Sequence, residues 1–243
     1  MSATAATVGT DTLLRVENVD TYYGDSHILR GLSLEIRRGE TVALLGRNGV
    51  GKTTTLKTIV GWVPPRSGRI TFDGTDLTGK EMMVNARLGI SLVPEERRIF
   101  TNLSVYENIK LAQVTAQRPG WSLQDVYDRF PRLKEREHNK GDEISGGEKQ
   151  MLAIARALVQ DTKLLLLDEP TEGLAPLIVR EVEAIVREIK AKGMTILLVE
   201  QNFYSALSLA DRCYVIDQGA IQFEGTPQEL KGNVEVLSRY LHV

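Results

Sequence analysis

One stretch decides the fold of this chain: Gly46-Arg47-Asn48-Gly49-Val50-Gly51-Lys52-Thr53. It fits the pattern G-x-x-x-x-G-K-S/T at every fixed position, directly after an apolar run at 42–45 and before a helical stretch at 52–60. In such a loop, backbone N–H groups close around phosphate oxygens, the lysine neutralises their charge, and the threonine hydroxyl binds Mg²⁺. The stretch therefore predicts a cradle for a nucleoside triphosphate with Mg²⁺.

Around this loop, short runs rich in Val, Ile and Leu alternate with helix-period segments, which is typical of an α/β protein with a parallel sheet. We expect buried strands at 41–45, 89–93, 163–167, 194–199 and 212–217. Alternating runs at 32–37 and 69–72 predict an antiparallel layer beside the parallel core. The apolar face of 179–189 predicts a helix that lies on the sheet.

The chain is organised as one domain with an insertion. Strand signals vanish between about 95 and 148, and Arg118, Pro119 and Gly120 break the helical pattern there. Together with the helical pattern that follows, this predicts an α-helical subdomain at about 95–160, inserted in a single domain of residues 13–243. The small, polar residues 1–12 are expected to form a disordered tail without the features of a signal peptide.

Composition excludes several classes of protein. With 30 Lys and Arg against 32 Asp and Glu, the formal charge is −2, which provides no bulk positive field, so a nucleic-acid partner is not expected. The longest aliphatic run, 164–167, is far too short to cross a bilayer. A lone cysteine, Cys213, cannot form an intrachain disulfide and fits a reducing compartment; its apolar neighbours predict a buried strand residue.

Two carboxylates follow the apolar run at 164–167. Asp168 and Glu169 come at the carboxyl end of a predicted buried strand, where α/β proteins assemble their sites, and Pro170 indicates that the strand ends there. Asp168 is expected to hold Mg²⁺. Glu169 is expected to orient or deprotonate the attacking water.

A third motif is Ser145-Gly146-Gly147-Glu148, which leads into an apolar helix. Taken alone it predicts a helix start with Ser145 as the N-cap. Free N–H groups and a hydroxyl at a helix start also make a good anion site. Sequence spacing does not identify the anion.

The order of the three motifs resembles the ATP-binding subunit of an ABC transporter, from about residue 13 to the C-terminus. The resemblance implies the ABC ATPase fold: a RecA-like P-loop NTPase core with a parallel sheet, an antiparallel β layer and an inserted helical subdomain. It also implies a head-to-tail dimer in which the Ser-Gly-Gly segment contacts the γ-phosphate held by the partner. Tyr23 corresponds to the aromatic residue that stacks on adenine, and the neighbouring Tyr22 is the alternative.

The expected site residues form three groups. Those expected to bind ATP are Tyr23, Gly46, Arg47, Asn48, Gly49, Val50, Gly51, Lys52, Thr53, Thr54, Glu95, Ser145, Gly146, Gly147 and Glu148. Those expected to hold Mg²⁺ are Thr53, Asp168 and Glu95. Those expected to act in catalysis are Glu169, Gln201 and Lys52.

Two positions depart from the general family pattern. Glu95 stands where most members carry a glutamine, and Gln201 stands where most carry a histidine. This pair, with Gly-Leu-Ala-Pro at 173–176, is similar to the LivF-type subunit of branched-chain (hydrophobic) amino acid importers. A neutral amide at Gln201 can donate a hydrogen bond to the γ-phosphate but cannot act as an imidazolium, so the proton role falls on Glu169.

The resemblance also implies partners and a place in the cell. The expected partners are membrane permease subunits, a second ATPase subunit that is a related chain or a second copy, and a separate substrate-binding protein. The expected location is peripheral, on the cytoplasmic face of the inner membrane. The alternatives are a urea or amide importer, an exporter or lipid-transport ATPase, a soluble ABC ATPase, and a non-hydrolysing cassette. Arg97 and Arg98, beside Glu95, are interpreted either as a solvated charge pair or as residues that face the membrane subunit.

Overall fold

The computed structural model describes residues 11–241. A six-stranded sheet forms its centre, in the spatial order β10-β9-β3-β8-β7-β6. These strands are β3 (Thr41–Leu45), β6 (Ile90–Val93), β7 (Leu164–Asp168), β8 (Thr195–Glu200), β9 (Arg212–Asp217) and β10 (Ala220–Gly225). Strands β3, β6, β7, β8 and β9 are parallel, and β10 pairs antiparallel with β9. Every residue of β3, β7 and β8 is buried, as expected for strands covered on both faces.

An antiparallel sheet forms a second layer, in the order β2-β1-β4-β5. Its strands are β1 (Thr12–Tyr23), β2 (Ser26–Arg37), β4 (Ser67–Phe72) and β5 (Thr75–Asp76). Apolar side chains of this sheet form one core with α1 (Lys52–Ile59) and with alternate residues of the central strands, such as Leu164 and Leu166. The antiparallel layer therefore covers one face of the central sheet.

Helices cover the opposite face of the central sheet, where the intervening residues Leu165 and Leu167 point. Beneath β6 to β8 lie α6 (Gly146–Leu158) and α7 (Pro176–Ala191). Beneath β3 and β9 lie α8 (Phe203–Leu209), α9 (Pro227–Gly232) and α10 (Val234–Val236), followed by a π-helical turn at Leu237–Leu241. Each part of the sheet thus has its own apolar cover.

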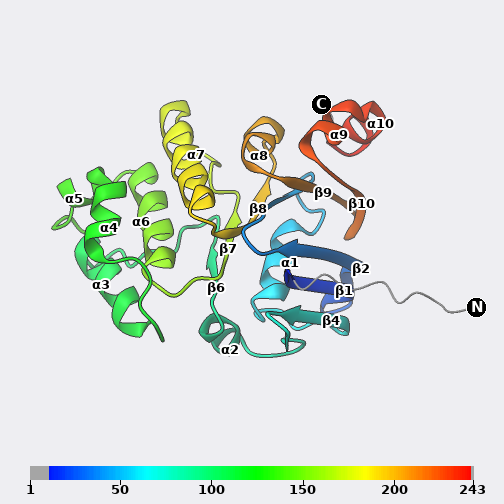
Figure 1. Ribbon diagram of the computed structural model, residues 1–243, viewed down its shortest axis with the longest axis horizontal. Helices are drawn as coiled ribbons and strands as arrows, with labels where there is room; N and C mark the ends of the chain where they lie inside the picture. The colour runs from blue at the N-terminus through cyan, green and yellow to red at the C-terminus, as the bar shows by residue number, and fades with distance from the viewer. Residues whose placement is uncertain (1–10, 242–243) are drawn as a thin grey trace, which may run out of the picture.

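The inserted subdomain lies at one end of the molecule, on the left in Figure 1. It contains α3 (Val105–Thr115), α4 (Leu123–Arg129), α5 (Pro131–Glu135) and the start of α6, whereas α2 (Met82–Arg87) precedes β6. Helix α6 belongs to both parts, since its apolar residues pack against the subdomain helices and against the sheet. A displacement of the subdomain would therefore move the amino end of α6 relative to the sheet.

The predicted α/β fold with an antiparallel layer and an inserted helical subdomain is confirmed. Strand β1 begins at Thr12, inside the segment assigned to the tail, because Asp11 already accepts a hydrogen bond from Arg38 N. The remainder of that tail, residues 1–10, lies outside the described residues. Cys213 is fully buried in β9, and burial raises the pKa of its thiol to about 12, so it is a structural residue.

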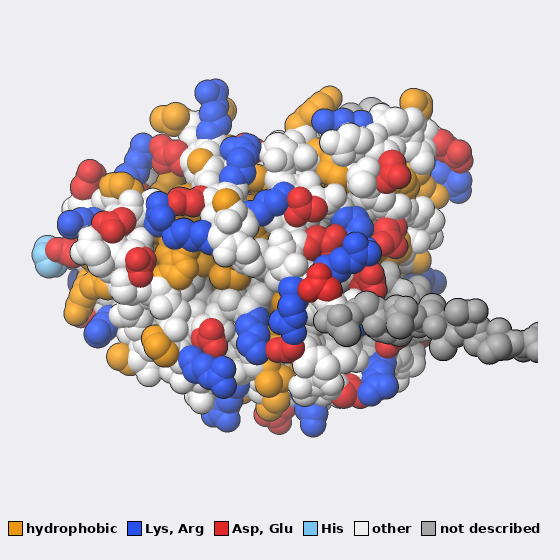
Figure 2. All heavy atoms as spheres, in the orientation of Figure 1, with side chains coloured by type: hydrophobic (Ala, Val, Ile, Leu, Met, Phe, Trp, Pro, Cys, Tyr) orange, Lys and Arg blue, Asp and Glu red, His pale blue; other side chains and the backbone are white. Residues whose placement is uncertain are grey.

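Two surface properties complete the description. In the part of the chain that the structure covers, no helix combines the length and the apolar character needed to cross a membrane. Lys and Arg side chains are interspersed with Asp and Glu over the face in Figure 2, so neither sign of charge dominates that face.

Candidate active site

The phosphate-binding loop joins the carboxyl end of β3 to the amino end of α1. Gly51 is the N-cap of α1, with φ of 117°, and a β-carbon added there would lie 2.9 Å from Leu29 Cδ2. A β-carbon added at Gly46 would lie 2.5 Å from the carbonyl oxygen of Ile216. Glycine is therefore required at both positions for the loop to pack against β2 and β9 while it turns into the helix.

Lys52 is buried and ties the loop together. Its Nζ donates hydrogen bonds to the carbonyl oxygens of Gly46 at 2.9 Å and Arg47 at 3.1 Å. It also forms an ion pair with Glu169 Oε1 at 3.0 Å. A phosphate group would offer Lys52 charged acceptors in place of neutral carbonyl oxygens, which are weaker partners.

Asp168 and Thr53 form the predicted metal-binding pair. Thr53 Oγ1 donates a hydrogen bond to Asp168 Oδ1 at 3.1 Å, so a hydroxyl from α1 meets a carboxylate from the end of β7. Burial, with smaller contributions from the negative charges of Glu169 and Glu95, raises the pKa of Asp168 to about 6. A divalent cation at this carboxylate would favour its charged form, so the chemistry of the pair fits Mg²⁺.

The same pair does not amount to a complete metal site. No group of three or more His, Cys, Asp and Glu side chains within residues 11–241 is arranged to hold a metal ion. Mg²⁺ ordinarily takes one or two carboxylates and completes its coordination with phosphate oxygens and water. The residues therefore suit a cation that arrives with a nucleotide.

Glu169 is held in an uncommon backbone conformation. Strand β7 ends at Asp168, and Glu169 has φ of 46°, in the left-handed region that few residues other than glycine adopt. Its N–H donates to the carbonyl oxygen of Val199 at 2.9 Å, which anchors the turn to β8. Because the strand has ended, the two adjacent carboxylates need not point to opposite faces, and both can reach the same site.

Glu172 is a residue of this site that the sequence reasoning missed. Its N–H donates to the carbonyl oxygen of Glu169 at 3.1 Å, which closes a turn and brings the two side chains together. Burial disfavours the charged form of Glu169, but hydrogen bonds with Glu172 and Lys52 outweigh it and lower the pKa of Glu169. Hydrogen bonding with Glu169 raises the pKa of Glu172 to about 7, so Glu172 is the member of the pair that carries the proton.

A cavity of about 270 Å³ opens between the loop and these carboxylates. Its lining residues are Asn48, Gly49, Gly51, Lys52, Thr53, Thr54, Glu95, Glu169 and Glu172. The structure thus brings together most of the predicted loop, the predicted Glu95 and the predicted base. Tyr23, the Ser145 segment and Gln201 do not line this cavity.

The Ser145 segment forms the start of α6. Ser145 is the N-cap and accepts a hydrogen bond from Glu148 N at 3.3 Å, while Glu148 Oε2 accepts one from Ser145 N at 2.7 Å. Glu148 therefore closes a capping box, and contact between Glu148 and nucleotide stays a prediction. Ser145 and Gly146 are exposed, whereas a β-carbon added at Gly147 would lie 2.5 Å from Ile178 Cγ2, so Gly147 allows α7 to pack closely.

The two tyrosines at the end of β1 have different surroundings. Tyr22 stacks on His27 with ring centroids 4.1 Å apart, and the Arg66 guanidinium lies over its ring at 4.0 Å. Tyr23 is 45% exposed. Because the ring of Tyr22 is already covered, Tyr23 is the better candidate for stacking on a base, as the sequence predicted.

Gln201 follows β8 and is exposed, whereas the preceding Glu200 is buried. Glu200 Oε1 accepts hydrogen bonds from Thr171 Oγ1 at 2.7 Å and from Thr171 N at 3.3 Å, and burial raises the pKa of Glu200. Glu200 thereby joins the end of β8 to the segment after Glu169. No motif in the sequence distinguished it from a surface glutamate.

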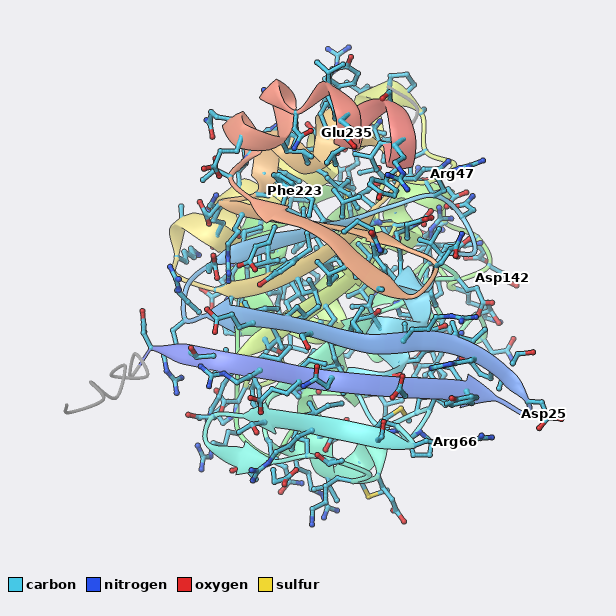
Figure 3. The ribbon with its side chains drawn as sticks, turned by 90° about the vertical axis from the view of Figure 1, so that its right-hand side faces the viewer. Asp25, Arg47, Arg66, Asp142, Phe223 and Glu235 are labelled. Atoms are coloured by element: carbon cyan, nitrogen blue, oxygen red, sulfur yellow. The ribbon has the colours of Figure 1, made fainter. Side chains whose placement is uncertain are left out.

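Figure 3 shows how the separate segments are arranged. Three labelled residues lie toward the same edge of the molecule in this view: Asp25, two residues after the exposed Tyr23, Arg47 in the phosphate-binding loop, and Asp142, shortly before α6. The segment after β1, the phosphate-binding loop and the segment before α6 therefore lie toward one edge in this view, although they come from distant parts of the chain.

Comparison with known proteins agrees with this arrangement. The profile described as "ABC transporter" matches residues 29–172. The chain belongs to the ABC transporter family. It is a nucleotide-binding cassette with ATPase activity, as the combination of phosphate-binding loop, Asp168-Glu169 pair and Ser-Gly-Gly helix start indicates.

Three relatives illustrate the range of the family around this cassette. It is 42% identical to the high-affinity branched-chain amino acid transport ATP-binding protein BraG of Pseudomonas aeruginosa, over 94% of this chain and 99% of that protein. It is 36% identical to the lipopolysaccharide export system ATP-binding protein LptB of Escherichia coli, over 94% of this chain and 96% of that protein. The ADP conformation of MJ1267, an ATP-binding cassette of an ABC transporter, superposes with a TM-score of 0.80 and 27% identity, over 94% of this chain and 98% of that one.

Proposed function

We propose that this cassette hydrolyses ATP to energise an importer of branched-chain or other hydrophobic amino acids through separate membrane subunits. The observation that carries the proposal is the higher identity to BraG than to LptB over nearly the whole of each chain. Glu95 and Gln201 support it, because both depart from the general family pattern in the direction of the LivF-type subunit. A urea or amide importer and a lipid exporter are the competing assignments.

The geometry supports the following chemical roles for the residues. Lys52 exchanges its carbonyl and Glu169 partners for phosphate oxygens, and the release of Glu169 frees a carboxylate that accepts a proton from the attacking water. Thr53, Asp168 and Glu95 would hold Mg²⁺, which neutralises charge on the phosphates when bound. The amide of Gln201 donates a hydrogen bond to the γ-phosphate and takes no part in proton transfer.

The exposed start of α6 supports pairing of two cassettes. Ser145 and Gly146 are exposed and line no part of the cassette's own phosphate cavity, so they are available to a nucleotide held by a partner. Nucleotide bound between two cassettes would favour a closed dimer, and hydrolysis would weaken it. The partner is a related chain or a second copy.

A groove beside the Glu95 loop is the docking site that we assign to a membrane subunit. It has a volume of about 540 Å³ and lies between α2, β6 and α6. Trp62, Met82 and Met83 line it and are 42%, 52% and 63% exposed. Exposed methionines suit an apolar partner whose shape they adapt to. This contact would keep the cassette peripheral, on the cytoplasmic face of the membrane.

Co-purification tests the docking site. Met83→Asp places a charge in the groove and is expected to abolish recovery of the permease subunits with the tagged cassette. Val234→Asp, at a residue of α10 that is 74% exposed and outside the groove, is the matched control and should retain them. Equal recovery with both variants would contradict the assignment.

Uptake measurements test the substrate class. In a host strain that lacks the gene for this chain, uptake of radiolabelled leucine should be lost, and the wild-type gene should restore it. Lys52→Ala should fail to restore it, because the phosphate cavity loses the buried ammonium group that faces Glu169. Normal leucine uptake combined with loss of urea uptake, or with defective lipopolysaccharide export, would assign the cassette to one of the competing systems.

A further inference from the structure

The inward orientation of the Arg97 side chain is not explained by the nucleotide site. Arg97 lies in the loop after β6, two residues beyond Glu95, and it is half-buried, whereas the sequence left it either as a solvated charge or as a residue that faces the membrane subunit. Arg98, beside it, is exposed and pairs with Glu96 at 2.8 Å. The two arginines therefore have different surroundings, and Arg97 alone turns into the protein.

The guanidinium of Arg97 reaches two elements that come much later in the chain. Its Nε donates a hydrogen bond to Gln150 Oε1 on α6 at 3.2 Å, and its Nη2 donates to the carbonyl oxygen of Glu172 at 3.3 Å. A β-carbon added at Gly146 would lie 3.2 Å from Arg97 Nη1, so the guanidinium lies against the first turn of α6. One side chain thus bridges the Glu95 loop, the α6 start and the turn after Glu169.

The environment of Gln150 shows that this contact is specific. Gln150 is 2% exposed, and its Nε2 has no hydrogen-bond partner within residues 11–241. Its Oε1 receives Arg97 Nε, which is the hydrogen bond that orients this buried amide. Loss of the arginine would leave both ends of the amide unsatisfied, at a cost that favours a different placement of α6.

The backbone of the loop also serves this contact. Arg97 and Arg98 have φ of 64° and 43°, both in the left-handed region that costs a non-glycine residue free energy. Arg97 N donates to the carbonyl oxygen of Pro94 at 2.9 Å, which closes the turn. Such a backbone conformation persists where surrounding contacts hold it, and the hydrogen bonds of Arg97 are among these contacts, together with the one from Arg156 to the carbonyl oxygen of Arg98.

We propose that Arg97 is a positioning residue for ATP hydrolysis: its planar guanidinium fixes the position of the amino end of α6 relative to the Glu169–Glu172 turn. It does not line the phosphate cavity, so it acts through the α6 start and through the turn that carries the base. Arg97 also lines the groove between α2 and α6, so the same side chain contacts the surface beside the Glu95 loop.

The expected signature is a separation of turnover from nucleotide binding. In the purified full-length chain, Arg97→Ala should lower kcat for ATP about tenfold, the effect of losing a charge-assisted hydrogen bond that acts during reaction. The KM for ATP and the Kd for Mg-ADP should stay within about twofold of wild type, because the cavity lining is intact. Arg97→Lys should resemble Arg97→Ala, since an ammonium cannot span two acceptors as the fork does.

Two further variants make the test specific. Gln150→Ala should reduce kcat, and the double variant Arg97→Ala/Gln150→Ala should be no slower than Arg97→Ala, because the contact that Gln150→Ala removes is already lost in Arg97→Ala. Arg132→Ala is the matched control: Arg132 Nη2 joins α5 to Glu181 on α7 at 2.9 Å and makes no hydrogen bond to Gln150 or Glu172 within residues 11–241, so its loss should leave kcat unchanged.

Four outcomes would overturn the proposal. Wild-type turnover by Arg97→Ala would show that the bridge does not matter. An equal loss in Arg132→Ala would show a general loosening of the subdomain. Full turnover by Arg97→Lys would show that charge alone suffices. Loss of Mg-ADP binding in parallel with turnover would place the effect in the folding of the cavity itself.

Discussion

The two ends of the central sheet bury charged side chains in different ways. At the amino end, Arg212 begins β9, and its Nε and Nη2 donate to both oxygens of Glu40 at 2.8 and 3.0 Å. It also donates to the carbonyl oxygen of Glu35 at 2.7 Å and to the Tyr214 hydroxyl at 3.1 Å. Burial opposes the charge of Arg212, but the bonds to Glu40 and its other partners outweigh burial and raise its pKa. This cluster is fully paired and joins the two sheets.

At the carboxyl end, the pairing is incomplete. The buried Lys52 pairs with Glu169, and Asp168 accepts a hydrogen bond from Thr53, while Glu95 and Glu172 lie on the cavity wall. Two pKa values are raised there, to about 6 for Asp168 and about 7 for Glu172. Burial of charge is therefore no mark of a reactive site by itself. A reactive site is indicated instead by an excess of buried charge of one sign, which a bound ligand can balance.

The largest effect should come from the carboxyl end, in Glu169→Gln. The amide keeps the shape of the side chain but cannot accept a proton, so turnover should fall about 10²- to 10⁴-fold. Binding of Mg-ATP should persist, because the loop and Lys52 are unchanged. Phosphate release and calorimetry measure the two quantities. Turnover at the wild-type rate would show that another group accepts the proton.

At the amino end, Arg212→Ala should reduce stability instead of activity. Removal of the guanidinium leaves the largely buried Glu40 without its partner, and breaking such a buried pair costs about 3–5 kcal/mol of unfolding free energy. Urea unfolding measures this loss. The Kd for Mg-ADP, measured on protein that remains folded, should stay at the wild-type value. A parallel loss of nucleotide affinity would contradict the separation of the two ends.

Asp168→Asn should stabilise the nucleotide-free cassette above pH 6. The rise in the pKa of Asp168 from 3.8 to about 6 means that the folded state binds its proton more tightly than the unfolded state. Stability of the wild type should therefore fall as pH rises from about 4 to about 6, by roughly 3 kcal/mol, and then stay level in this respect. The variant should lack this fall.

Urea unfolding at pH 4 and pH 8 measures the difference. Asp76→Asn is the control, since Thr78 lowers the pKa of the exposed Asp76 and the asparagine should give no stabilisation. If Asp168→Asn is no more stable than the wild type at pH 8, burial of the Asp168 carboxylate does not destabilise the folded protein.

The smallest effect should come from Gln201→His. Gln201 is exposed and lies outside the phosphate cavity, and either side chain can donate a hydrogen bond to a phosphate oxygen. Turnover should stay within about threefold of wild type, or rise, because the change restores the side chain that is commoner in the family. Complete loss of phosphate release would show that the amide has a further role.

Local sequence patterns determined the parts of this protein that depend on neighbouring residues. The Gly46–Thr53 loop, the Asp168-Glu169 pair at a strand end and the Ser145 cap could each be predicted, because glycine geometry, strand termination and helix capping act over a few residues. The alternation of apolar runs predicted the α/β fold for the same reason. The resemblance to ABC cassettes then predicted which of these motifs cooperate.

Only the tertiary structure decided which distant side chains meet. Arg97 contacts Gln150 and Glu172, 53 and 75 residues further along the chain, and no spacing rule distinguishes it from Arg98. The same holds for Glu172, which looks like a surface residue until the turn after Glu169 brings the two carboxyls together. Such contacts depend on how the helical subdomain, the loop after β6 and the sheet pack in three dimensions, and the local pattern of residues contains no record of that packing.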